Sequence, residues 1–319
     1  MNPQDKPPPR DFRKEVTDDI IKMLEEGAAP WQKPWAAGEL GRTPFNPTTN
    51  KPYHGGNVLN LMISAMRHGY SDPRWLTYKQ AADKGWQVRK GEKSTRIEFW
   101  ETKRGSKEEG ADDDEKRSRL IHRVYSVFNA EQIDGITPIH IEPRKPFEVI
   151  EAAETLLKNS GAEIKHGGGR AFYSPSGDFV QMPPRECFTD EPHYYATVLH
   201  ELAHWTGAGQ RLNRLSEKAR FGSPEYAKEE IRADLASLYM AAELGIPYDP
   251  KDQAGYIQNW IQVLKNDKNE VFKAASDASK ICDYLHSLEN GKVKTEGAYP
   301  GPHTERASEQ VQARQSWAR

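Results

Sequence analysis

Cysteine is scarce in this chain of 319 residues, which contains only the two residues Cys187 and Cys282. Two distant cysteines cannot build a disulfide framework or an all-cysteine zinc site. Apolar runs are short, and none approaches the ~20 residues of a membrane span. The N-terminus lacks the apolar region of a secretory signal. These absences predict a cytoplasmic protein without a membrane partner, in which histidines and carboxylates are the available metal ligands.

Net charge is also small. The 45 Lys and Arg nearly cancel the 47 Asp and Glu, which leaves a net charge of -2. Taken alone, that balance argues against a generally basic nucleic-acid-binding chain. The charge is uneven, however, because the segment from Pro30 to Arg104 holds 13 Lys and Arg against 6 Asp and Glu. The same segment holds five of the eight tryptophans.

The length and the uneven composition predict an α+β protein with two domains. An α+β domain is expected over residues 1–136, with an exposed charged loop at 103–119 where both charge signs mix without apolar periodicity. The proline-rich segment 137–146 is the expected linker. A mainly helical domain with a small sheet is expected over 147–290, followed by a polar tail at 291–319.

Hydrophobic periodicity locates the main elements of secondary structure. It predicts helices at 11–26, 57–68, 148–159, 192–207, 224–244, 250–265 and 268–288, and strands at 96–101 and 124–128. Residues 171–183 are predicted to form a hairpin, because two short apolar runs flank a Ser-Pro-Ser-Gly-Asp turn. An edge strand beside an active site can pair with extended substrate, and Asp178, Phe179 and Val180 are candidates for such a strand. An ordinary packing hairpin is the alternative.

The clearest motif is HELAH, from His200 to His204, inside the helix predicted over 192–207. Histidines four residues apart lie on one helix face, so both imidazoles can bind one Zn²⁺ at roughly 2.0–2.1 Å. Glu201 lies beside the first histidine and is the candidate catalytic residue, a general base for water. The alternative is a surface helix with incidental histidines, which the apolar neighbours of the motif disfavour.

A catalytic zinc site needs a third protein ligand. The metzincin pattern would place a histidine at position 210, which is Gln210, and His193 is two helical turns away, about 11 Å. A later helix offers carboxylates instead, with Glu230 as the candidate ligand and Glu229 as the near alternative. Asp234 follows one turn after Glu230 and is the candidate that orients a ligating histidine. Alternatively, both glutamates are first-turn acids that interact with the helix dipole.

The basic N-terminal part interleaves aromatic residues with Lys and Arg, chiefly over residues 75–100. Bases stack on aromatic rings while cations neutralise phosphates, so this composition suits single-stranded nucleic acid better than readout of a duplex major groove. The sequence contains no helix-turn-helix, Cys/His finger or RRM signature. The alternative is that the tryptophans are core residues and the charges form a solvated face. The candidate contact residues are Trp35, Tyr53, Asn57, Trp75, Tyr78, Lys79, Arg89, Lys90, Lys93 and Arg96.

Several of these segments have a family resemblance. The segments APWQKPW (29–35), KPYHGGNVLNL (51–61), DPRWLTYKQA (72–81), GWQVRKGEKST (85–95) and VFNAEQIDG (127–135) resemble the N-terminal domain of ArdC-type antirestriction proteins. Plasmid primases of the TraC type carry a similar domain. The later segments HELAHWTG (200–207) and YAKEEIRADLAS (226–237) resemble the zincin-like, gluzincin-type metallopeptidase domain of the same family.

The resemblance implies a domain that binds single-stranded DNA, followed by a zinc metallopeptidase domain. It implies a role in protecting incoming conjugative DNA from host restriction in the bacterial cytoplasm, including that of the recipient cell. It carries over His200, His204 and one of the two glutamates Glu229 and Glu230 as zinc ligands, and Glu201 as catalytic base. Other divalent metals also suit such ligands. The resemblance identifies neither the protein substrate nor the oligomeric state. The alternative function is a stoichiometric shield of single-stranded DNA whose metal site is structural or idle.

Overall fold

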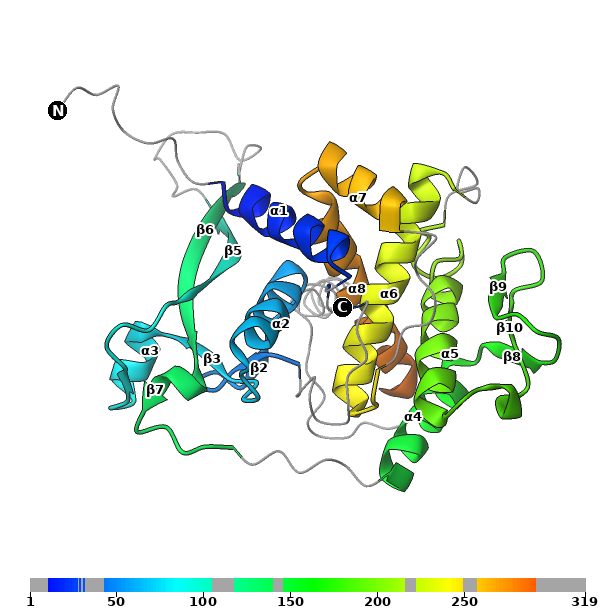
Figure 1. Ribbon diagram of the computed structural model, residues 1–319, viewed down its shortest axis with the longest axis horizontal. Coiled ribbons are helices and arrows are strands. Elements are labelled where there is room, and N and C mark those ends of the chain that lie inside the picture. Colours follow the sequence, from blue (N-terminus) through cyan, green and yellow to red (C-terminus); the bar gives the residue numbers. More distant parts are fainter. Residues whose placement is uncertain are drawn as a thin grey trace, which may run out of the picture.

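The computed structural model describes residues 11–27, 29, 31, 43–104, 118–139, 146–215, 222–248 and 257–290. Helices and small sheets are mixed along these residues, which confirms the α+β prediction (Figure 1). None of the described helices has the length and apolar character that a membrane crossing requires. The predicted tail at 291–319, Trp35 and most of the predicted linker lie outside the described residues, and Pro146 already begins a helix.

The helical half of the molecule is built around α6 (Pro224–Leu244). This helix packs against α5 (Glu191–Thr206) and α8 (Glu270–Asn290), with α4 (Pro146–Ser160) and α7 (Ile257–Asn266) nearby (Figure 1). Nearly every residue of α6 from Glu229 onward is buried, so the helix lies inside the core on all sides. The buried carboxylates of α6 are therefore held in a packed, poorly hydrated environment.

Local signals explain where the two central helices begin. Asp190 caps α5 by accepting a hydrogen bond from the backbone N–H of His193, and Pro192 occupies the first turn. Ser223 caps α6 in the same way, and Pro224 follows it. A side-chain oxygen at the cap satisfies an otherwise unpaired backbone donor, and proline fits the first turn because it has no N–H to pair. The helices predicted at 192–207 and 224–244 are confirmed.

A small sheet beside α5 consists of β8 (Glu163–His166), β10 (Phe179–Met182) and β9 (Phe172–Ser174), in that spatial order. The predicted hairpin is confirmed as β9 and β10, which pair antiparallel. The prediction that Asp178, Phe179 and Val180 belong to an edge strand is wrong, because β10 is the central strand and pairs parallel with β8 on the side away from β9. The crossover that brings β8 next to β10 leaves no local signature in the hairpin sequence.

The N-terminal part contains a long two-stranded ribbon, formed by β5 (Thr95–Arg104) and β6 (Ser118–Asn129), with β3 (Trp75–Thr77) beside β6. The strands predicted at 96–101 and 124–128 are confirmed. The loop predicted at 103–119 is too long, because β5 continues to Arg104 and β6 begins at Ser118. Mixed charges on a solvated ribbon do not interrupt backbone pairing, which explains the difference.

Shorter elements surround the base of this ribbon. Strands β1 (Phe45–Asn46) and β2 (Lys51–Pro52) pair with each other, as do β4 (Gln87–Val88) and β7 (Ile133–Asp134). Helix α2 (Gly56–His68) confirms the helix predicted at 57–68. The short helix α3 (Tyr78–Asp83) was not predicted from the sequence patterns. Helix α2 lies along β5, where the side-chain amide of Asn57 bonds both the N–H and the C=O of Glu98 at 2.9 and 2.8 Å.

The first two helices, α1 (Phe12–Glu25) and α2, also join the core of the C-terminal helices. The Thr17 hydroxyl donates to the Lys268 carbonyl at 2.7 Å, and the Gly55 N–H donates to the Ser279 hydroxyl at 2.9 Å. Apolar residues of α1 and α2 belong to the same buried cluster as α5, α6 and α8. Residues from the two halves of the sequence therefore share one core.

Gly56 of α2 lies in close contact with the ring of Phe272 on α8 in this shared core. A Cβ atom there would lie 2.4 Å from Cδ1 of Phe272, whose ring is 5% exposed. Replacing Gly56 with Ala is therefore expected to lower the free energy of unfolding by about 1–3 kcal/mol, although alanine is the better helix former. Urea denaturation measures the change.

Gly169→Ala is the matched control, because the added Cβ would meet no atom within 4 Å. Equal urea midpoints for the two variants would show that α2 and α8 separate at little cost.

Candidate metal centre

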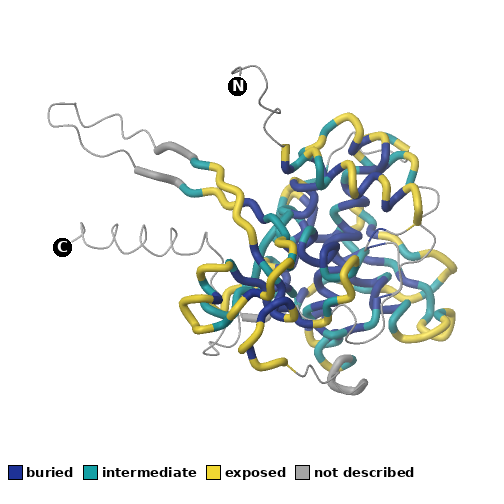
Figure 2. Tube along the Cα trace, turned by 60° about the vertical axis from the view of Figure 1, so that its left-hand side comes forward, coloured by how far each residue is buried: buried dark blue, intermediate teal, exposed yellow. Residues whose placement is uncertain are grey.

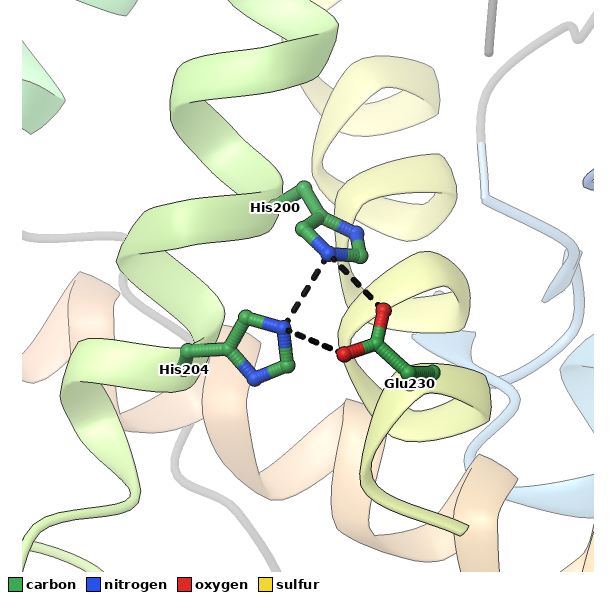
Figure 3. A group of neighbouring side chains, drawn as sticks. All are labelled: His200, His204 and Glu230. Carbon is green, nitrogen blue, oxygen red and sulfur yellow. Dashed lines mark hydrogen bonds and ion pairs between the residues drawn. The ribbon is translucent and has the colours of Figure 1, made fainter. Parts of the chain in front are cut away.

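Helices α5 and α6 bring three side chains to one point (Figure 3). His200 and His204 lie one turn apart on α5, and their Nε2 atoms are 3.1 Å apart. Glu230 on α6 reaches between them, with one carboxylate oxygen 3.5 Å from Nε2 of His200 and the other 3.5 Å from Nε2 of His204. Among the described residues, this is the group of His, Cys, Asp and Glu that could hold a metal ion.

The spacing of these atoms fits a tetrahedral metal ion. Ligands at roughly 2.0–2.1 Å from Zn²⁺ lie about 3.3 Å from one another. The three observed separations, 3.1, 3.5 and 3.5 Å, fall close to that value. Nitrogen and carboxylate donors from two histidines and one glutamate are also the set used by catalytic zinc sites of one metallopeptidase class. The geometry favours Glu230 over Glu229 as the third ligand.

Two further carboxylates contact the Nδ1 atoms of the imidazoles, the ring nitrogens that do not face Glu230. Asp234 lies 2.9 Å from Nδ1 of His200, and Glu229 lies 3.3 Å from Nδ1 of His204. A carboxylate that accepts the Nδ1–H selects the tautomer in which Nε2 is free to bind a metal. Asp234 therefore lies beside Nδ1 of His200, and Glu229 has the same kind of position on the other histidine.

Arg214, which the sequence analysis missed, holds Glu229 in place. Its guanidinium donates to both carboxylate oxygens of Glu229, at 2.8 and 3.1 Å, and also to the carbonyl of Ala203 and the hydroxyl of Thr206. A fork-like pair of this kind fixes the carboxylate plane. Arg214 lies in the segment after α5, and no local motif distinguishes it from other surface arginines.

The charges around the site favour a cation. Burial alone would raise the pKa of Glu230, but the charge of His204 and a hydrogen bond with His200 lower it to about 2. Burial likewise opposes the charged form of Glu229, yet His204 and Arg214 lower its pKa. Both glutamates are therefore ionised at neutral pH. Their charge next to two imidazoles suits a divalent ion.

Glu201 follows His200 on α5, and its side chain is 8% exposed. It does not belong to the group of three potential ligands. Gln210, where the metzincin pattern requires a ligand, donates to Asp178 at 3.1 Å. His193 lies at the start of α5, 2.6 Å from Asp190. Neither residue is part of the cluster.

Three of the predicted DNA contacts are engaged in packing or hydrogen bonds within the fold. Trp75 is 0% exposed and packs in a small cluster with Leu61, so its prediction as a stacking residue is wrong. The Tyr53 hydroxyl donates to the carbonyl of Trp75, and burial raises its pKa to about 12. Asn57 is engaged with β5 as described above. Apolar side chains from β3, α2 and β5 meet here, and only the tertiary contact shows that the aromatic residues are enclosed.

The remaining predicted contacts lie nearer the surface. Arg96 pairs with Glu15 and lies over the ring of Phe12, so it is engaged within the molecule. Arg89 is exposed but bonds Glu92 at 2.9 Å. The exposed residues Tyr78, Lys79, Lys90 and Lys93 remain predictions as DNA contacts.

Comparisons with known proteins match both halves of the chain. A model of the N-terminal domain of the anti-restriction factor ArdC matches residues 10–128, and a model of zincin-like metallopeptidases matches residues 151–277. Two crystal structures of the antirestriction ArdC protein from plasmid R388, one metal-free and one with Mn(II) bound, are 33% and 34% identical to this chain. For each structure the TM-score is 0.72, and the match covers 89% of this chain and 100% of the chain in the crystal structure.

Sequence relatives give the same result. An uncharacterized protein y4eC of Sinorhizobium fredii is 39% identical over 90% of this chain and 95% of its own length. Two Escherichia coli proteins named DNA primase TraC are 45% and 43% identical over 90% and 89% of this chain. The chain spans only 20% and 28% of the length of those two proteins.

Proposed function

Because the chain belongs to the ArdC family of antirestriction proteins, we propose that it protects plasmid DNA from host restriction as the DNA enters a bacterium by conjugation. Its N-terminal part binds the incoming single strand without sequence preference. Its metal centre is that of a zinc-dependent peptidase, which acts on a protein in the cytoplasm of the recipient cell.

The convergence of His200, His204 and Glu230 carries the peptidase part of this proposal. A bound divalent ion would supply Lewis acidity, which polarises a carbonyl group and acidifies water. The carboxylate of Glu201, one residue from the cluster, accepts the proton of the attacking water. Asp234 and Glu229 keep the imidazoles in the tautomer that such a site requires. A site built only for structure would have no use for a base at position 201.

The ligand set suits zinc, and we propose zinc as the resident metal. The R388 relative is described with Mn(II) bound, and a site of two imidazoles and one carboxylate accepts several divalent ions. Metal identity in the cell therefore depends on availability as well as on the ligands.

The DNA-binding part of the proposal is supported by the basic, aromatic composition of the N-terminal half and by the names of the relatives. One relative is an antirestriction protein and two are named DNA primases, so the shared region occurs in proteins that act on DNA. Aromatic residues among Lys and Arg suit single-stranded DNA, whose bases are free to stack.

Conjugation into matched recipients tests this function. When the chain is produced in the recipient, we expect more transconjugants of a plasmid that carries restriction sites, provided that the recipient has an active restriction enzyme. A recipient without restriction enzyme should show no increase, because there is nothing to protect against. An equal increase in both recipients would mean that the protein promotes transfer or replication and is not an antirestriction factor.

A further inference from the structure

The ribbon of β5 and β6 exposes an unusual share of apolar surface. Seven large hydrophobic residues are exposed among the described residues, and four of them, Phe99, Trp100, Val124 and Tyr125, belong to this ribbon. The ribbon projects from the body of the molecule (Figure 2). Exposed rings on a projecting element are costly for a free protein, so they indicate a surface that binds a partner.

The strand register divides these exposed residues between two faces. Phe99 pairs with Arg123 and Ile97 pairs with Tyr125, so these two pairs share one face, here called the aromatic face. On this face the rings of Phe99 and Tyr125 meet edge to face, 6.2 Å apart at 74°. Ile97 is buried with Val127 against α2, so the part of the ribbon next to these rings is held in place by the core.

The sequence of the ribbon is basic. The two strands contain five Lys and Arg against two Glu. The side chain of Arg123 is 46% exposed, and its guanidinium lies 3.8 Å from the carboxylate of Glu101 on the same face. An exposed ion pair of this length contributes little to stability, because water screens both charges. The guanidinium of Arg123 can therefore turn to a phosphate at small cost.

The opposite face of the ribbon is already occupied in part. Trp100 packs against His122, with ring centres 4.4 Å apart, and the guanidinium of Arg13 lies 5.6 Å from the Trp100 ring. Arg13 also pairs with the buried carboxylate of Glu98 at 2.7 Å. This face is therefore partly covered by its contacts with α1, which leave less of it free for a ligand.

We propose that single-stranded DNA runs along the aromatic face, with bases stacked on Phe99 and Tyr125 and phosphates beside Arg123. This inference rests on the proposed function and names its DNA-binding surface. Bases in a duplex are already stacked, so these rings favour a single strand. Two rings flanked by a cation offer far less than the ~800 Å² that each partner buries in a stable protein interface, which argues against a protein ligand.

Fluorescence anisotropy with a labelled oligo(dT) of about 20 nucleotides tests the proposal on the full chain, since a strand of that length exceeds typical site sizes. Phe99→Ala and Tyr125→Ala should each weaken binding about tenfold, because stacking of one base is lost. Arg123→Gln should lower the slope of log affinity against log salt by about 0.7 in magnitude. All three residues are exposed, so thermal midpoints should match that of the unchanged protein.

Matched variants distinguish this face from other exposed rings and cations of the molecule. Trp100→Ala removes a ring of similar exposure from the opposite face, and Phe172→Ala removes one that is 44% exposed on β9. Both should bind as the unchanged protein does. Lys165→Gln is the control for Arg123→Gln, since the two side chains are equally exposed at 46%.

Two outcomes would overturn the inference in distinguishable ways. If the unchanged protein binds single-stranded DNA but Phe99→Ala and Tyr125→Ala bind equally well, the proposed function stands and the aromatic face is not the site. An equal loss in Trp100→Ala would also refute the choice of face. If the unchanged protein fails to bind the strand, or if it binds duplex DNA as tightly, the DNA-binding part of the proposed function fails first.

Discussion

Replacing Glu201 with Gln is expected to lower peptidase activity by about 10²- to 10⁴-fold, the usual contribution of a general base. Glutamine has nearly the same shape but cannot accept the proton of the attacking water. Metal content should not change, because Glu201 is outside the group formed by His200, His204 and Glu230. Hydrolysis of fluorescently labelled casein by the zinc-loaded protein, with and without oligo(dT), measures the activity.

Glu191→Gln is the control for this substitution. Glu191 is exposed in the first turn of the same helix, so the chemical change is identical while the residue is remote from the metal centre. Its activity should equal that of the unchanged protein. If Glu201→Gln retained full activity, or if it lost bound metal together with activity, the assignment of Glu201 as base would be wrong.

The same variant distinguishes the two candidate modes of antirestriction. If proteolysis protects the incoming strand, Glu201→Gln should lose protection in the conjugation test while still binding single-stranded DNA. If the protein acts only as a stoichiometric shield, protection should be unchanged. The second result would remove the peptidase from the antirestriction role, and the DNA-binding surface would remain as the functional element.

Replacing Glu230 with Gln is expected to lower zinc affinity by more than about 100-fold, because an anionic ligand becomes a neutral amide with weaker donor strength. Replacing Glu229 with Gln should cost about 10- to 100-fold, the usual effect of a residue that orients a ligand from behind. Competition with a chromophoric chelator measures both affinities. The larger loss should therefore occur in the Glu230 variant.

Glu229→Gln should also have an effect that Glu230→Gln lacks. Arg214 is 10% exposed and forms its ion pair with Glu229 at 2.8 Å, so the variant leaves a buried guanidinium without its carboxylate. Removing one partner of a buried pair is strongly destabilising. We expect a clear fall in the urea midpoint of metal-free Glu229→Gln.

Glu225→Gln supplies the control for both variants, because Glu225 is an exposed acid in the first turn of the same helix. Its zinc affinity and urea midpoint should be unchanged. A larger loss of zinc in Glu229→Gln than in Glu230→Gln would reverse the ligand assignment.

The sequence by itself determined the helices of the metal centre and the residues that they carry. A spacing of four residues places His200 and His204 on one helix face whatever surrounds the helix. The caps Asp190 and Ser223 likewise act within one turn. These features depend on neighbours in the chain, and local rules predict them.

Tertiary structure alone decided which groups meet. Glu229 and Glu230 are adjacent in sequence, and only the packing of α6 against α5 turns one toward the Nε2 atoms and the other toward Nδ1 of His204. Arg214 joins the site by folding back from the segment after α5. Contacts of this kind join residues that are separated in the chain, so the spacing of Glu230 and Asp234 could name candidates but could not show which atoms meet.

The same difference between local and tertiary contacts explains the errors among the predicted DNA contacts of the N-terminal half. Composition correctly marked this part as basic and aromatic, but it could not separate a buried ring such as Trp75 from an exposed one such as Phe99. Both are aromatic residues in strands, and the difference arises from what packs against each strand. Helix α2 covers the base of the β5–β6 ribbon, while the described part of the ribbon beyond this base projects from the body of the molecule (Figure 2). The location of the exposed rings was therefore set by the packing of distant segments and not by local sequence.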